Sequence, residues 1–234
     1  MSELFSIQLQ NRQQQGRDGV WLDLPTTTEQ VQAALRQIGI SSDNPQGLFI
    51  SGYFAEEEKR FAIPYNMVLA SNVDELNFLA ARLETLSAGE RAELNAALQA
   101  PQSELSSIGK ITDFPENVEY YVYLPDVRGP AQLGDYYLNR SGMVNMPDEW
   151  KGGIDTAQFG RYVAQQEQGA FTQYGYLVKS GDEWQKVHEG QPVPEEYRVL
   201  SFPAPEVLRD SANIPPPVQP ETEPQKVIPI ILNG

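Results

Sequence analysis

The side chains able to do acid–base or nucleophilic chemistry are many carboxylates and a single imidazole. The chain has 32 Asp and Glu, one His and no Cys among its 234 residues, which excludes thiolate nucleophiles, thiolate metal sites and disulfides. A Ser–His–Asp triad would have to use His188, in the polar stretch KVHEGQP. The neighbouring acids Asp148–Glu149 and Asp182–Glu183 have the types that an acid–base hydrolase needs. At this abundance such pairs arise by chance, so a hydrolase is our third hypothesis and requires close carboxylates of shifted pKa in one pocket.

Two further stretches could bind a ligand, and both lack the pattern that the ligand requires. Gly16-Arg17-Asp18-Gly19 has neither the Lys nor the spacing of a phosphate-binding loop. The run Glu56–Glu58 could attract a hard cation, but no spaced calcium loop surrounds it, and a solvated turn is the better interpretation. We therefore expect no cofactor and no metal.

Charge and hydropathy narrow the function class further. With 17 Lys and Arg the formal net charge is -15 and the pI is about 4.4, so the chain repels phosphate and binding to nucleic acid is disfavoured. It has no apolar run long enough to span a membrane. Its first residues lack the basic and apolar regions of a signal peptide. We expect a cytoplasmic protein that binds or inhibits another protein.

The first predicted subdomain, residues 1–63, is a sheet with one helix. Alternating apolar residues predict a strand at Leu4–Leu9, and Val20–Leu24 predicts a second strand that ends at Pro25. Thr26 and Glu29 have capping-box spacing and predict the start of a helix. A further strand is expected at Leu48–Ile50.

The second predicted subdomain, residues 64–115, is a helical bundle. Capping-box pairs Asn72–Glu75 and Ser87–Glu90 precede apolar residues at helical spacing and predict a helical hairpin. Pro101 is expected to open a third short helix, PQSELSSIG. Carboxylates occupy the outward positions of these helices: Asp74, Glu84, Glu93 and Glu104.

The third predicted subdomain, residues 116–200, is a sheet with helices. Strands are expected at Glu119–Leu124 and Phe171–Val178, and helices at 131–140 and, capped by Asp155, at 156–166. Its many aromatic residues fit either a core or a self-association surface. The inward side of the second helix is expected to carry Phe159, Tyr162 and Val163.

The last segment, residues 201–234, contains eight of the 18 prolines, so we expect an extended or disordered tail. Its end, Val227–Leu232, is apolar enough to dock on a partner. The predicted fold class is therefore α+β: an elongated chain of three small subdomains followed by a disordered Pro-rich tail.

In order and spacing, several stretches between residues 3 and 179 resemble the ArdA family of antirestriction proteins. They are GVWLDLP, LFISGYF and the helix NVDELNFLAARLETL in the first half of the chain. In the third segment, Leu133-Gly134-Asp135-Tyr136-Tyr137, followed by Gly142 and Pro147, is similar to the family's antirestriction motif. The stretch Ile154–Arg161 is similar to a second family motif, from which it departs at Thr156-Ala157-Gln158 and Tyr162 by losing acidic residues.

This resemblance implies a non-catalytic, dimeric DNA mimic. Its surface carboxylates would imitate the phosphates of bent DNA, occupy the DNA groove of type I restriction-modification enzymes and block restriction and modification. Such proteins are carried by mobile genetic elements and phages and act in the bacterial cytoplasm. For the dimer contact we favour Leu133, Gly134, Tyr136 and Tyr137, with burial in the core as the alternative.

The expected mimic carboxylates are spread over the three subdomains. They are Asp18, Asp43, Glu56, Glu57, Glu58, Asp74, Glu75, Glu84, Glu93, Glu104, Glu116, Asp126, Asp135, Asp148, Glu149 and Asp155. The competing hypothesis is a non-catalytic adaptor that binds a partner through its Pro-rich tail.

Overall fold

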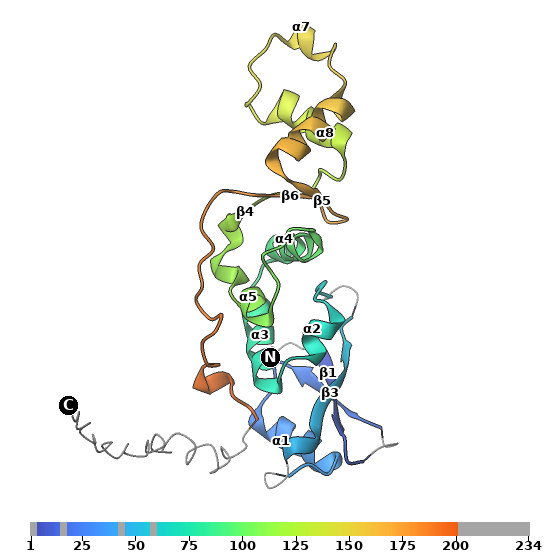
Figure 1. Cartoon of the computed structure of the whole chain (residues 1–234), viewed down its shortest axis with the longest axis vertical. Coiled ribbons are helices and arrows are strands. Elements are labelled where there is room, and N and C mark those ends of the chain that lie inside the picture. The colour runs from blue at the N-terminus through green and yellow to red at the C-terminus, as the bar shows by residue number, and fades with distance from the viewer. Residues whose placement is uncertain (1–3, 15–17, 42–44, 57–59, 201–234) are drawn as a thin grey trace, which may run out of the picture. The chain divides into compact units, whose positions relative to one another are not determined.

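Helices and antiparallel strands are mixed along the chain, as the α+β prediction requires (Figure 1). The computed structural model describes residues 4–14, 18–41, 45–56 and 60–200. The predicted tail and its apolar end lie outside these residues. The described residues all belong to one compact unit, which ends at Ser201. The division into three subdomains, and the elongation it implied, therefore stay predictions.

The N-terminal sheet has the strand order β2-β1-β3, with all pairs antiparallel. Its strands are β1 (Phe5–Asn11), β2 (Val20–Leu24) and β3 (Leu48–Phe54). Alternation places Ile7, Leu9, Leu22 and Leu24 on the buried face. The pairing of β1 with β3 shifts between Gln8 and Leu9. The two predicted N-terminal strands are confirmed, and the predicted strand at Leu48–Ile50 extends to Phe54.

Helix α1 (Thr28–Gln37) has its N-cap one residue later than the capping-box spacing predicts. Thr27 is the N-cap and forms the box with Gln30, whereas Thr26 is buried. The Thr26 N–H donates to Asn77 Oδ1 at 2.7 Å. Because that long-range hydrogen bond uses Thr26, the next threonine caps the helix.

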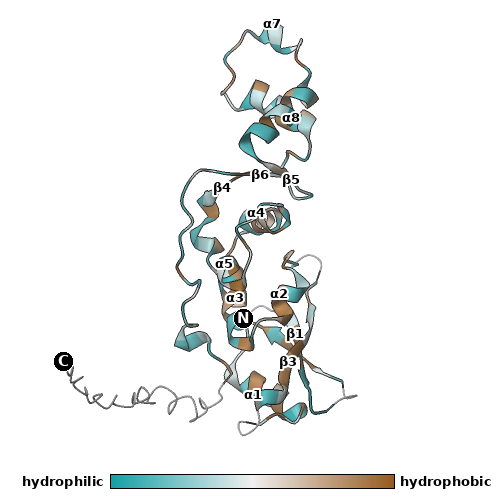
Figure 2. Cartoon of the chain, viewed as in Figure 1, coloured by the Kyte–Doolittle hydropathy of each residue, from teal (hydrophilic) through white to brown (hydrophobic). Residues whose placement is uncertain are grey.

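The helical region contains both predicted capping boxes and, before them, one helix that the sequence pattern does not predict. Asn72 and Glu75 cap α3 (Val73–Glu84), and Ser87 and Glu90 cap α4 (Ala88–Gln99). Before them, α2 (Tyr65–Leu69) is too short to show helical periodicity and was not predicted. Figure 2 shows hydrophobic residues gathered on α3, where Leu76, Leu79 and Leu83 are fully buried.

The helix expected from Pro101 is wrong. Residues 101–107 form turns, and α5 (Ile108–Thr112) begins only after its N-cap, Ser107. Ser103 Oγ accepts the Leu105 N–H at 3.1 Å, and the Ser106 N–H bonds to the Glu104 carbonyl at 2.8 Å. These local bonds compete with helical ones, as serine-rich stretches often do.

The C-terminal sheet has the order β4-β6-β5, again antiparallel. Its strands are β4 (Tyr121–Leu124), β5 (Ala170–Phe171) and β6 (Tyr176–Lys179). The single strand expected at Phe171–Val178 is wrong, because a turn interrupts it. Thr172 Oγ1 accepts the N–H groups of Tyr174 and Gly175 at 3.2 Å each, and Gly175 has a φ of 154°. Strand β4 is shorter than predicted, since Val118–Tyr120 forms a 3-10 turn.

Two glycines set the packing of α6 (Pro130–Asp135) on α8 (Thr156–Glu167). A Cβ atom on Gly134 would lie 1.9 Å from the Thr156 carbonyl oxygen, and one on Gly160 would lie 1.8 Å from that of Pro130. The two backbones therefore touch, which only glycine permits. Helix α6 continues as a π-helical turn (Tyr136–Arg140), so the predicted helix at 131–140 is largely confirmed.

Helix α8 also has its predicted Asp155 cap, with Asp155 Oδ1 accepting the Gln158 N–H at 2.9 Å. The inward side predicted for α8 is partly wrong. Tyr162 is 59% exposed, and the buried positions are Gly160 and Ala164. The close approach of α6 at Gly160 turns this face, rather than the aromatic one, toward the core.

The segment after β6 is tied to the helical region by buried polar side chains. Asp113 is fully buried, and its oxygens accept the N–H groups of His188 at 2.6 Å and Glu189 at 3.2 Å. Asn117 exchanges two hydrogen bonds with the Gln185 backbone, at 2.7 and 2.9 Å. Further along, Asn77 donates to the Tyr197 carbonyl at 3.0 Å. The remaining short elements are η1 (Pro45–Gly47), η3 (Phe114–Glu116), α7 (Asp148–Lys151) and η6 (Glu195–Tyr197).

The outward position predicted for Glu93 is also wrong. This residue is only 8% exposed, and its Oε1 has no hydrogen-bond partner among the described residues. Removal from water, together with the nearby Glu90 charge, raises the pKa of Glu93 from 4.5 to about 7. The side chain lies on the packed side of α4, so at neutral pH it presents little charge to a partner.

We predict that Gly160→Ala destabilises the protein, because the new Cβ would overlap the Pro130 carbonyl oxygen. The expected loss in the free energy of unfolding is about 1–3 kcal/mol. The matched control is Gly89→Ala in α4, where the nearest atom, Ser87 Oγ, is 4.0 Å away. Since Ala favours helix over Gly, the control should gain up to about 1 kcal/mol. Urea denaturation of both variants measures the difference, and equal midpoints would contradict the close approach.

A second prediction concerns pH. The folded-state pKa of Glu93 lies above its unfolded value, so the stability that this group contributes should be fully present below about pH 4.5 and be lost as pH rises through 7. The full contribution corresponds to at most about 3 kcal/mol. Glu93→Gln should remove this fall, whereas Glu196→Gln, at an exposed position, should keep it. Urea denaturation at pH 5 and pH 8 tests this, and identical pH dependence in the three proteins would refute the buried ionisation.

Candidate functional site

The expected mimic carboxylates have three different environments. Asp43, Glu57 and Glu58 lie outside the described residues, and Glu93 is buried. Half-buried positions are Asp74, Glu84, Glu104 and Asp135, and exposed positions are Asp18, Glu56, Glu75, Glu116, Asp126, Asp148, Glu149 and Asp155. Most of the predicted set is therefore accessible to a partner.

Several accessible carboxylates already neutralise a cation of the same chain. Glu104 Oε1 lies 2.5 Å from Lys179 Nζ, and this hydrogen bond lowers the pKa of Glu104. Asp148 pairs with Lys151 at 2.7 Å, and Glu116 pairs with Arg82. Exposed pairs of this kind add at most about 1 kcal/mol to stability. Their main effect is to cancel part of the acidic field.

Other predicted carboxylates serve the fold through backbone hydrogen bonds. Asp74 Oδ1 accepts the N–H groups of Val199 and Leu200 at 2.8 Å each. Glu75 and Asp155 cap helices. Within the described residues, Asp18, Asp126 and Glu149 form neither an ion pair nor a cap. These three are the members of the set with the most charge available to a partner.

The structure gathers one group of carboxylates around a polar hollow of about 760 Å³. Helix α4 provides Glu90, the turns before β4 provide Glu116 and Glu119, and the segment after β6 provides Asp182 and Glu183. Only Glu116 belongs to the predicted set. The other members were missed because the hollow joins three stretches that are far apart in the sequence. No local pattern could have revealed it.

The hollow is held in shape by backbone and amide hydrogen bonds. The Ser180 N–H donates to the Tyr120 carbonyl at 2.9 Å, and Asn117 bonds to Gln185. The Asp182 N–H bonds to Ser180 Oγ at 3.2 Å. The backbone at Asp182 and Glu183 is thereby held beside the turns that carry Glu116 and Glu119, so the positions from which the carboxylates extend are set before any partner binds.

The residues favoured for a dimer contact lie largely inside the C-terminal region. Leu133 and Gly134 are buried, and Leu133 belongs to a core cluster with Val127, Ala164 and Tyr176. Tyr136 and Tyr137 are half-buried. The Tyr137 hydroxyl donates to Glu167, as does that of Tyr176 at 3.0 Å. Burial, and then the Glu167 charge, raises the pKa of both tyrosines.

Part of the surface beside these tyrosines is apolar and open. Val122 is 46% exposed and Met143 is 76% exposed, and both line a hollow of about 380 Å³ with Tyr136 and Tyr137. A contact with a second copy could form there, while Leu133 and Gly134 would support it from within. The dimer role of the four residues stays a prediction.

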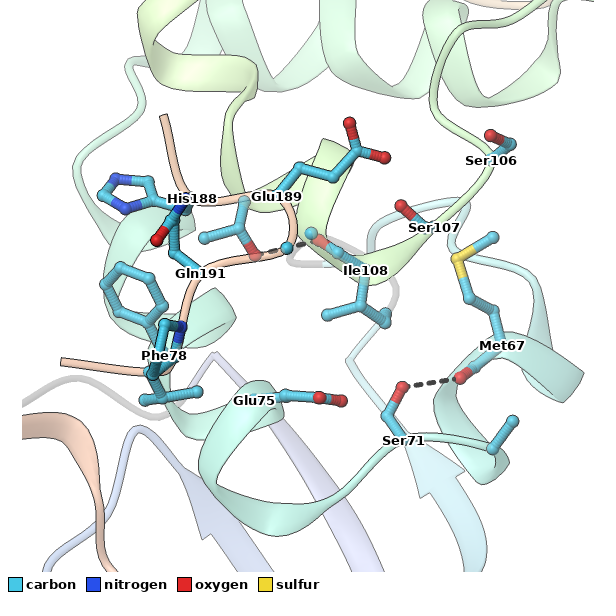
Figure 3. A pocket seen from close by; sticks show the side chains of 16 residues that line it. Met67, Ser71, Glu75, Phe78, Ser106, Ser107, Ile108, His188, Glu189 and Gln191 are labelled. Carbon is cyan, nitrogen blue, oxygen red and sulfur yellow. Dashed lines mark hydrogen bonds between the residues drawn. The ribbon is translucent and has the colours of Figure 1, made fainter. Parts of the chain in front are cut away.

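An apolar cleft of about 610 Å³ is the place to look for the hydrolase alternative (Figure 3). Its polar residues include Glu75 and Glu189, which extend from separate elements, and His188. Each has another contact: Glu75 caps α3, Glu189 lies 3.6 Å from Lys186, and the His188 ring meets the Phe78 ring edge to face, with 4.9 Å between the ring centres.

Two of the three serines of the cleft have hydroxyl groups that are bonded to backbone. Ser71 Oγ donates to the Met67 carbonyl at 2.8 Å, and Ser107 Oγ accepts the Lys110 N–H at 3.2 Å. Among the described residues, no hydrogen bond joins a serine of this cleft to His188. The arrangement gives no support to a Ser–His nucleophile here.

The described ranges contain no group of three or more His, Asp or Glu that could hold a metal ion. They also contain no helix with the length and apolar character to cross a bilayer.

Comparison with known proteins gives one assignment. No curated protein matches the sequence at a significant level. The family model described as "Antirestriction protein (ArdA)" matches residues 15–178. The match begins after β1, includes the helices α1 to α8 and the hollow residues Glu90, Glu116 and Glu119, and ends within β6, before Asp182, Glu183 and the Pro-rich tail. Because it covers most of the chain, the chain belongs to the ArdA family of antirestriction proteins.

Proposed function

We propose that this protein is a non-catalytic DNA mimic that occupies the DNA-binding groove of type I restriction-modification enzymes. Surface carboxylates would stand in for DNA phosphates and block both restriction and modification. Membership of an antirestriction family and the net charge of -15 support this proposal. The enzyme would be met in the cytoplasm of the bacterial host, after a phage or another mobile element delivers its DNA.

The observation that carries the proposal is the acidic hollow formed by Glu90, Glu116, Glu119, Asp182 and Glu183. Its carboxylates come from three stretches of chain, whose backbones are held together by the hydrogen bonds around Asn117 and Ser180. A groove that binds DNA is lined by Lys and Arg that contact phosphates. Carboxylates held in place can make the same contacts with little loss of conformational freedom, and so compete with DNA.

The net charge of two copies matches the charge on a short stretch of DNA duplex. Two copies at -15 each carry -30, which matches the charge on about 50 Å of DNA at one charge per ~1.7 Å. We propose a homodimer formed through the surface around Tyr136 and Tyr137, where Val122 and Met143 are exposed. Dimerisation would place two acidic hollows in one molecule.

The test is a competition assay with a type I restriction enzyme bound to labelled duplex DNA. The wild-type protein should displace the DNA, and displacement should weaken as salt rises, because salt screens the carboxylates from the target's cations. Glu119→Gln, Asp182→Asn and Glu183→Gln, combined stepwise, should each weaken inhibition about two- to five-fold and reduce its dependence on salt.

The matched control removes two exposed carboxylates elsewhere, with Glu195→Gln and Glu196→Gln in η6. This control should weaken inhibition less than the equivalent changes in the hollow. Equal effects would mean that the carboxylates of the hollow contribute only through the overall charge of the protein. A total loss from one hollow substitution would point to a localised site and argue against mimicry, as would inhibition that is insensitive to salt.

A further inference from the structure

The outer face of the N-terminal sheet carries an aromatic pair that the core does not use. The strand register places residues in two rows across the three strands. One row is Trp21, Gln8 and Gly52, and the other is Asp23, Ser6 and Phe54. Since side chains alternate along a strand, these two rows lie on one face. The opposite face holds buried Ile7 and Leu22.

Both aromatic residues of this face are half open to solvent. Trp21 is 49% exposed and Phe54 is 52% exposed, and their rings meet edge to face at 6.5 Å. A Cβ atom on Gly52 would lie 3.0 Å from Trp21 Cη2, so the absence of a side chain there leaves room for the indole across the middle strand. Paired, exposed aromatic side chains often mark an interaction surface.

A carboxylate completes this face. Asp23 is exposed and lies two residues from Trp21 on the same side of β2, at a separation of about 6–7 Å along the strand. Ser6 Oγ donates to its Oδ1 at 2.9 Å, which fixes the carboxylate. Within the described residues Asp23 forms no ion pair, so its negative charge is not cancelled.

An indole face next to a fixed carboxylate is suited to a guanidinium group. Arginine stacks on aromatic rings, with Trp the best acceptor, and binds carboxylates through paired N–H donors. Lysine lacks the planar group that does both. A partner with arginine on a basic surface also complements the net charge of -15.

We propose that Trp21, Asp23 and Phe54 form a docking site for an arginine side chain on the DNA-binding surface of the inhibited enzyme. The inference rests on the proposed function and adds a contact that a phosphate cannot make. The affinity that comes from the acidic hollow depends strongly on salt concentration. The affinity that comes from stacking on Trp21 depends only weakly on salt concentration.

The experiment measures the dissociation constant for a purified type I restriction enzyme at three salt concentrations. Trp21→Ala should weaken binding about three- to thirty-fold at every salt concentration, without changing the slope against salt. Trp21→Phe should lie between Trp21→Ala and wild type. Asp23→Asn should weaken binding mainly at low salt and make the slope shallower.

The matched control is Trp150→Ala, at an aromatic residue of α7 that is 66% exposed. It should bind as wild type does, and thermal melting should show that all variants are folded. Wild-type affinity in both Trp21→Ala and Asp23→Asn would overturn this inference and leave the proposed function standing. So would an equal loss in Trp150→Ala, or a change in oligomeric state in Trp21→Ala, which would indicate a contact between copies. Failure of the wild-type protein to bind would overturn the proposed function itself.

Discussion

The acidic hollow depends on a few buried polar side chains between β4 and the helical region. Asp113 is fully buried and accepts two backbone N–H groups of the segment after β6, and hydrogen bonds to a charged acceptor contribute about 1.5–3 kcal/mol each. Asn117, four residues later, bonds to both backbone groups of Gln185. Between β6 and η6 this segment forms no helix or strand, so these side-chain bonds act together with the bonds from Ser180 to the Tyr120 carbonyl to hold Asp182 and Glu183 beside Glu116 and Glu119.

The parts of the fold that could be predicted are those encoded locally. The Val20–Leu24 strand, the capping boxes of α3 and α4, and the Asp155 cap of α8 each depend on residues within one turn or strand, and each is confirmed. Errors arose where a distant partner competes. Thr26 bonds to Asn77, so the cap of α1 moves to Thr27. The hollow was missed for the same reason, since Asp113 and Asn117 look like ordinary polar residues until the chain returns to them.

The motif residues that carry the family resemblance serve the fold as much as any surface. Gly134, within LGDYY, and Gly160, within the second motif, let the backbones of α6 and α8 touch. Leu133 fills the core beside them, and Tyr137 reaches Glu167 on α8. The motif residues that carry the resemblance are therefore ones that the packing of α6 on α8 requires. The surface carboxylates are less constrained by packing, which is why the motifs identify the family better than they identify the site.

Net charge alone is a poor measure of what an acidic protein offers a partner. Glu93 counts toward the total of -15 but is buried with a pKa of about 7. Asp148 and Glu104 also count, yet each lies against a lysine of the same chain. The carboxylates that remain available are Glu119, Asp182 and Glu183 in the hollow and isolated ones such as Asp126 and Glu149, because Glu116 pairs with Arg82 and Glu90 caps α4. Their effect on a basic groove depends on position, because screening weakens charges that are not close to their partners. If the proposed function holds, the polar contacts that fix those positions are as important as the number of acidic residues.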